Sequence, residues 1–146
     1  MGKRAVALTS AAAVVTALAA GAYLWVQATY VLPAASCGLW GMPGQLPGAP
    51  GAAQCFAAAA RTCADAGVRV HWQGTETATD DVYVIRPGGR PGQCPVTAYS
   101  QVRALGPVPG RVETAACQAS VTGAGVAISC PPGPAAIIVI RPSPGR

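Results

Sequence analysis

A long stretch without charge constrains this chain more than any other feature of its sequence. Residues 5–60, 56 in number, contain no Asp, Glu, Lys, Arg or His, and two basic residues, Lys3 and Arg4, stand directly before them. A short positive region followed by an apolar run is typical of N-terminal segments that direct a chain into or across a membrane. We therefore expect the part of the chain that follows to be extracytoplasmic.

Residues 1–36 are predicted to form a signal peptide or a transmembrane anchor. Their apolar part, Ala5–Val26, has 22 residues, close to the roughly 20 that a membrane-spanning helix requires. If it is retained, this part anchors an extracytoplasmic domain to the cell membrane, with the N-terminus inside. Small residues suited to signal-peptidase cleavage also occur, so secretion is the alternative. The candidate cleavage motifs are Ala20–Ala22, Val26–Ala28 and Ala34–Ser36.

Six cysteines follow this segment, and their spacing favours disulfides over metal binding. No CxxC pair occurs, which argues against zinc ribbons, thioredoxin-type redox motifs, haem attachment and the common iron–sulfur sites. Because the chain has one histidine, a mixed cysteine–histidine zinc site is also disfavoured. In an oxidising compartment, six cysteines indicate three disulfides. They are Cys37, Cys55, Cys63, Cys94, Cys117 and Cys130.

One disulfide follows from the geometry of a predicted hairpin. Two segments with strand-forming residues flank residues 122–125, and a two-residue type II′ loop at Gly123–Ala124 would connect them. Counting outward from that loop places Cys117 opposite Cys130, on a non-hydrogen-bonded pair where side chains are closest. We therefore predict a disulfide between these two residues.

The other four cysteines leave two pairings open. Cys55 and Cys63 lie eight residues apart on a predicted helix, about 12 Å along its axis, which is too far for them to bridge each other. The pairings are Cys37–Cys55 with Cys63–Cys94, or Cys37–Cys63 with Cys55–Cys94. The first is favoured because it closes the local loop between the first two cysteines.

The residues before Cys37 resemble the signal of bacterial lipoproteins, in which small residues precede a cysteine that receives the lipid. Ala34 stands where that signal usually has a large aliphatic residue, and lipidation would leave an odd number of cysteines. Parity therefore favours a disulfide at Cys37. The chain as a whole is similar to small exported bacterial proteins, often lipoproteins, in which a short α+β domain follows a signal and a Gly/Pro-rich tether.

Residues 37–51 are expected to form such a tether, since eight of the residues 38–51 are Gly or Pro. Residues 52–146 are expected to form an α+β domain, with one helix packed on a small antiparallel sheet and held by disulfides. Residues 95–105 fit either a helix or a strand, and a strand is favoured. The predicted helix spans 52–66 and is ended by Gly67, and the predicted strands span 68–73, 82–86, 94–105, 112–121, 126–130 and 135–141.

Little in the sequence points to catalysis. His71 is the one candidate general base, and its place on the polar face of a predicted strand is typical of an exposed histidine. No GxSxG elbow presents a serine nucleophile. Glu76, Asp80 and Asp81 are expected in a solvated turn and lack the spacing of an EF-hand. We therefore expect no enzyme activity, no metal and no cofactor, and the absence of a basic stripe with interleaved aromatic residues predicts no nucleic-acid partner.

A second resemblance is to the subtilisin-inhibitor family of secreted protease inhibitors. Its members have a Pro/Gly-rich disulfide loop leading into a helix, as Cys37–Cys55 would form here, and they expose a Cys-Pro-x-x segment to the protease. The resemblance implies an inhibitor loop at Pro95, Val96 and Thr97, directly after Cys94. We favour a non-enzymatic extracytoplasmic domain that binds a protein or an envelope component or has a structural role there, and the alternative is a secreted protease inhibitor.

Overall fold

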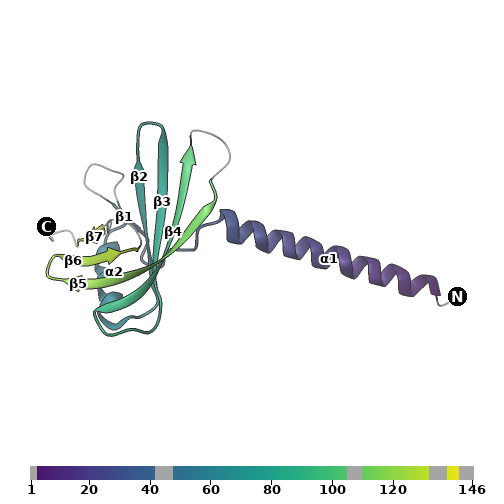
Figure 1. Cartoon of the computed structure of the whole chain (residues 1–146), viewed down its shortest axis with the longest axis horizontal. Coiled ribbons are helices and arrows are strands. Elements are labelled where there is room, and N and C mark those ends of the chain that lie inside the picture. Colours follow the sequence, from purple (N-terminus) through teal and green to yellow (C-terminus); the bar gives the residue numbers. More distant parts are fainter. Residues whose placement is uncertain (1–2, 42–47, 105–109, 132–137, 142–146) are drawn as a thin grey trace. The chain divides into compact units, whose positions relative to one another are not determined.

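The computed structural model describes residues 3–41, 48–104, 110–131 and 138–141 (Figure 1). The chain divides into two compact units, residues 1–31 and 32–146. The first unit holds helix α1, Lys3–Tyr30. Among the helices of the described ranges, none combines the length and the hydropathy that crossing a membrane requires, which differs from our expectation for residues 5–26.

The second unit is an α+β domain, as predicted. Helix α2, Ala52–Thr62, packs on a seven-stranded sheet whose strands lie side by side in chain order. Neighbouring strands are antiparallel, except that β1 runs parallel to β2 (Figure 1). The strands are β1 (Leu39–Trp40), β2 (Ala66–Gln73), β3 (Thr77–Ile85), β4 (Gln93–Ala104), β5 (Val112–Thr122), β6 (Gly125–Ser129) and β7 (Ile138–Ile140).

Both faces of this sheet carry buried apolar side chains, because successive residues of a strand point to opposite faces. On one face, Phe56 and Ala60 of α2 are fully buried in the main core. On the other face, Leu32 and Ala35 belong to a smaller cluster with residues of β3, β4 and β5. The strand residues of that cluster are Val82, Val84, Tyr99 and Val112. Residues 32–36, which we expected to belong to the signal segment, are therefore part of the folded domain.

Helix α2 is shorter than the predicted helix over 52–66. It ends at Thr62, and Cys63 adopts the left-handed conformation with φ 55°. The N–H of Ala64 then donates to the carbonyl of Ala59. Gly67 does not end the helix but lies in β2, paired with β3. The prediction was wrong at this end because the chain must turn at Cys63, whose side chain is bonded to the start of β4.

The predicted tether over 37–51 also contains regular structure. Leu39–Trp40 forms β1, in register with Arg69–Val70 of β2. Backbone hydrogen bonds extend this contact on the N-terminal side, since the N–H of Cys37 donates to the carbonyl of Gly67. The described part of this Gly/Pro-rich segment is therefore attached to the edge of the sheet.

The β5–β6 hairpin has the predicted register but not the predicted turn. Val121 pairs with Val126 and Thr122 with Gly125. A type II′ turn requires a positive φ at Gly123, whereas the positive φ of 137° occurs at Gly125. The hydroxyl of Thr122 accepts a hydrogen bond from the N–H of Ala124 at 3.3 Å, which helps to close the turn.

Two further strand predictions are decided by pairing. Residues 93–104 form a strand, as favoured, because β4 pairs with β3 on one side and with β5 on the other. Strand β3 begins at Thr77 rather than at the predicted Val82. The last predicted strand, 135–141, begins outside the described residues, and its described part contains β7.

Candidate functional site

Three disulfides connect the elements of the folded domain, with the pairing favoured from the sequence. The Cα–Cα distances are 5.6 Å for Cys37–Cys55, 5.3 Å for Cys63–Cys94 and 4.2 Å for Cys117–Cys130. None of the cysteines is free. Cys37 is therefore not the unpaired thiol that lipidation would require.

Helix α2 is fixed at two points by these bonds. Cys55, in its first half, is bonded to Cys37, two residues before β1, and Cys63, at its C-terminal end, is bonded to Cys94 at the start of β4. The helix has only 11 residues and no acidic residue in its first turn, so its intrinsic stability is low. Its position on the sheet is therefore maintained by the disulfides and by core packing.

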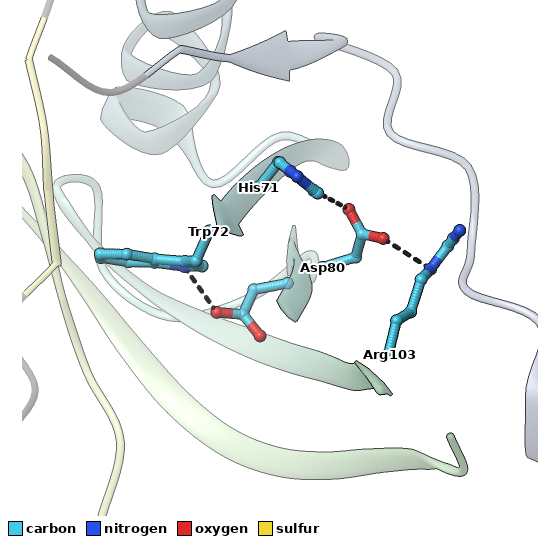
Figure 2. A network of polar contacts seen from close by, with 5 residues as sticks. His71, Trp72, Asp80 and Arg103 are labelled. Carbon is cyan, nitrogen blue, oxygen red and sulfur yellow. Dashed lines mark hydrogen bonds and ion pairs between the residues drawn. The ribbon is translucent and has the colours of Figure 1, made fainter. Parts of the chain in front are cut away.

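A charged network crosses β2, β3 and β4 on the sheet face opposite α2 (Figure 2). Nδ1 of His71 lies 2.9 Å from Oδ1 of Asp80, and Nε of Arg103 donates to Oδ2 of Asp80 at 2.9 Å. The Asp80 side chain is 8% exposed and that of His71 is 18% exposed, whereas that of Arg103 is 52% exposed. We call His71, Asp80 and Arg103 the charged network. Each oxygen of its buried carboxylate has a cationic or ring-nitrogen partner.

Asp81, the residue after Asp80 in β3, belongs to a second polar group, which lies on the sheet face that α2 covers. The indole N–H of Trp72 donates to Oδ2 of Asp81 at 3.0 Å, and the Tyr83 hydroxyl donates to the same oxygen at 3.5 Å. Burial raises the pKa of the Tyr83 hydroxyl well above its usual range, and the negative charge of Asp81 raises it further. This phenol therefore stays protonated as a hydrogen-bond donor.

These contacts correct the predicted acidic turn. Asp80 and Asp81 lie within β3, and because side chains alternate along a strand, the two carboxylates point to opposite faces. They do not form a cluster with Glu76, which precedes β3. Within the described ranges, no group of three or more His, Cys, Asp or Glu residues is arranged to hold a metal ion.

The charged network resembles part of a catalytic site in one respect only. A carboxylate and the histidine that it orients are two of the three members of a catalytic triad, and the third is a nucleophile hydrogen-bonded to the second ring nitrogen. Among the described residues, His71 has its one side-chain hydrogen bond to Asp80. The geometry shown is that of a cross-strand clamp, in which Asp80 connects β2 to β4.

Replacing Asp80 with alanine tests this interpretation. We expect the free energy of unfolding to fall by about 1–3 kcal/mol, because two donors lose their acceptor and the histidine ring is largely buried. Urea denaturation followed by circular dichroism measures the change. Glu76→Ala is the matched control, since this acid is exposed in the β2–β3 turn, and it should change stability by less than about 0.5 kcal/mol. Equal effects of the two substitutions would refute the clamp.

The predicted inhibitor loop lies in the middle of the sheet. Pro95 pairs with Gln118 of β5, and Val96 and Thr97 pair with both β3 and β5. Cys94 is fully buried and Val96 is 3% exposed. A protease cleft binds an extended, accessible loop, whereas this segment has neighbouring strands on both sides. Pro95 itself is exposed and Thr97 is half-buried, but the segment is a strand of the sheet and not the loop that the resemblance implies.

Sequence reasoning named His71 and Asp80 but did not bring them together, and it missed Arg103 and Gln101. Arg103 and Gln101 lie in β4, and the buried Gln101 stands opposite Asp80 and donates from its side chain to the carbonyl of Gly110 at 2.8 Å. The usable signal was the alternation of polar residues at 97, 99, 101 and 103.

Comparison with known proteins found no matching family model, no matching curated protein and no matching solved structure.

Proposed function

We propose that the domain beginning at Leu32 is an exported, non-enzymatic binding domain whose partner is a protein or a component of the cell envelope. The observation that carries the proposal is the complete pairing of six cysteines across the domain. Disulfides persist in oxidising compartments and are rare in reducing ones. A small domain also has a small hydrophobic core, so disulfides contribute a large share of its stability.

The N-terminal segment supports the same location. Lys3 and Arg4 begin α1 and are followed by an uncharged run, and this order is typical of export signals. In this proposal residues 1–31 direct the domain across the membrane. Cleavage would release a secreted domain, and retention of the segment would leave the domain at the cell membrane.

Binding is favoured over catalysis by the way the polar groups are used. The buried carboxylate of Asp80 is engaged by His71 and Arg103, and Asp81 is engaged by Trp72 and Tyr83. These contacts hold the strands in one arrangement. A domain with a disulfide-fixed helix and cross-strand clamps presents a preorganised surface, which lowers the entropy lost on binding a partner.

Intact mass spectrometry under non-reducing conditions tests export and oxidation together. Cells expressing the chain would be treated with an alkylating reagent, and protein would be recovered separately from the cytoplasm, the membranes and the medium. We expect material in the membranes or the medium to carry no alkylated thiols. A processed mass in the medium indicates secretion, and a full-length mass in the membranes indicates an anchored domain. Recovery mainly in the cytoplasm with alkylated cysteines would overturn the proposal.

A further inference from the structure

Within the part of the chain that the structure describes, one half of β5 has a neighbouring strand on one side only. Strand β4 pairs with β5 from Val112 to Ser120, whereas β6 pairs only with Gln118–Thr122 (Figure 1). The disulfide between Cys117 and Cys130 ends this second contact. Among the described residues, nothing pairs with 112–116 on the side of β6. We call residues 112–116 the open edge.

Among the described residues, the one protective feature of the open edge is the charged side chain of Glu113. Residues 113–116 are all exposed, and their side chains are Glu, Thr, Ala and Ala. Natural sheets usually block such an edge with lysine, proline, a bulge or a covering segment. In this segment there is no lysine or proline, and the register with β4 is continuous.

The backbone groups that face outward can be identified from one hydrogen bond. The N–H of Val121 donates to the carbonyl of Gly92 at 2.9 Å, on the side of β4. Since hydrogen-bonding direction alternates along an antiparallel strand, the odd-numbered residues of β5 bond to β4. The N–H and C=O groups of Val112, Thr114 and Ala116 therefore point away from β4, along the open edge. A further strand would satisfy them.

We propose that the open edge pairs with the open edge of a second copy of this chain, antiparallel and centred on Thr114. In this register Val112 of each copy stands opposite Ala116 of the other, so the outward groups of both edges bond to each other. The pairing uses the whole free length and stops where β6 begins. The proposal extends the function proposed above by naming a surface and a partner, but it does not depend on export.

Charge selects this register over its neighbour. With the axis on Thr114, the carboxylate of Glu113 stands opposite the small side chain of Ala115. With the axis one residue earlier, on Glu113, the two Glu113 carboxylates would face each other, and like charges directly opposite are destabilising. An axis one residue later, on Ala115, would require Gln118, whose outward side is already paired with β6.

A site-specific crosslink on the full-length, oxidised protein in detergent tests the proposal. The native cysteines are all paired, so a short bismaleimide reacts only with an introduced thiol. Thr114→Cys should give a high yield of covalent dimer, because the two side chains stand about 5 Å apart in the proposed register. Glu76→Cys, in the exposed β2–β3 turn, is the control. Association through α1 alone would crosslink both positions alike and would overturn the proposal.

Substitutions at position 115 test the register without changing the backbone. Ala115→Lys places two ammonium groups opposite two Glu113 carboxylates, and Ala115→Glu places carboxylates there instead. We expect dimer affinity, measured by sedimentation in density-matched detergent, to differ between the two variants by about an order of magnitude in favour of lysine. Raising the salt concentration should reduce this difference. Equal affinities would exclude the register.

Loss of the edge donors provides an independent test. Ala116→Pro removes an outward N–H and leaves the bonds to β4 in place, so the domain should fold and fail to dimerise. Ala116→Val keeps the N–H and should dimerise. If the proline variant does not fold, the two variants at position 115 still decide the question. These tests use purified protein, so a failure to dimerise would not contradict the proposed export. Likewise, a cytoplasmic location would not contradict dimerisation through the open edge.

Discussion

Replacement of Cys63 and Cys94 together by alanine is expected to lower the free energy of unfolding by about 3–4 kcal/mol. This disulfide spans 31 residues, the longest separation of the three. It connects the end of α2 to the start of β4, and Cys94 is fully buried. Without it, the unfolded chain gains conformational freedom and the end of α2 loses its covalent attachment to the sheet. Because a small domain is stable by only about 5–15 kcal/mol, the loss is a large fraction of the total.

The matched control is the alanine pair at Cys117 and Cys130. Its loop spans 13 residues and closes a hairpin that is already held by strand pairing. Loop length alone makes its expected loss smaller by about 1 kcal/mol. Urea denaturation of both variants and of the native protein, in buffer without reductant, gives the comparison. If replacing Cys117 and Cys130 lowers the free energy of unfolding as much as replacing Cys63 and Cys94, the proposed role of the longer bond in holding α2 is incorrect.

Local geometry explains what the sequence could predict. The Cys117–Cys130 pairing followed from counting along one hairpin, and the structure has the same register. This worked although the turn type was wrong, because a two-residue loop fixes the register whatever its backbone conformation. The pairing of Cys37 with Cys55 was likewise favoured by a short separation along the chain.

Contacts between distant segments explain what it could not predict. The end of α2 at Thr62 is set by a bond to Cys94, 31 residues beyond Cys63. Strand β1 has two residues, too few for a periodic pattern, and it exists because it pairs with β2. Residues 95–105 were ambiguous by composition; residue 105 lies outside the described residues, and pairing with β3 and β5 shows that 95–104 belong to a strand.

The charged network was missed for a related reason. The predicted strand over 82–86 omitted the first part of β3, so Asp80 was assigned to a turn. The β-branched residues Thr77 and Thr79 were a weak local signal for the longer strand. Even with correct strand boundaries, the approach of Arg103 to Asp80 depends on the register between β3 and β4. Residues 86–92 connect these two strands, and a connection of this length does not fix the register as the two-residue loop between β5 and β6 does.

Replacement of Phe56 by alanine is the second substitution with a large expected effect. Phe56 is the one phenylalanine of the chain, and in α2 it is completely buried against the sheet. Its neighbours on the buried side of α2 are alanines, which are too small to fill the space left behind. They are Ala52, Ala53, Ala57 and Ala60. We expect the free energy of unfolding to fall by about 3–5 kcal/mol, from lost apolar burial and from the remaining cavity.

Two further variants separate packing from helix propensity. Gln54→Ala, on the exposed side of the same helix, should change stability by less than about 0.5 kcal/mol. Phe56→Leu keeps most of the apolar volume and should cost less than Phe56→Ala, since the cavity that it leaves is smaller. Chemical denaturation of all three measures the order. An effect of Phe56→Ala no larger than that of Gln54→Ala would mean that the two disulfides, rather than apolar packing, hold α2 on the sheet.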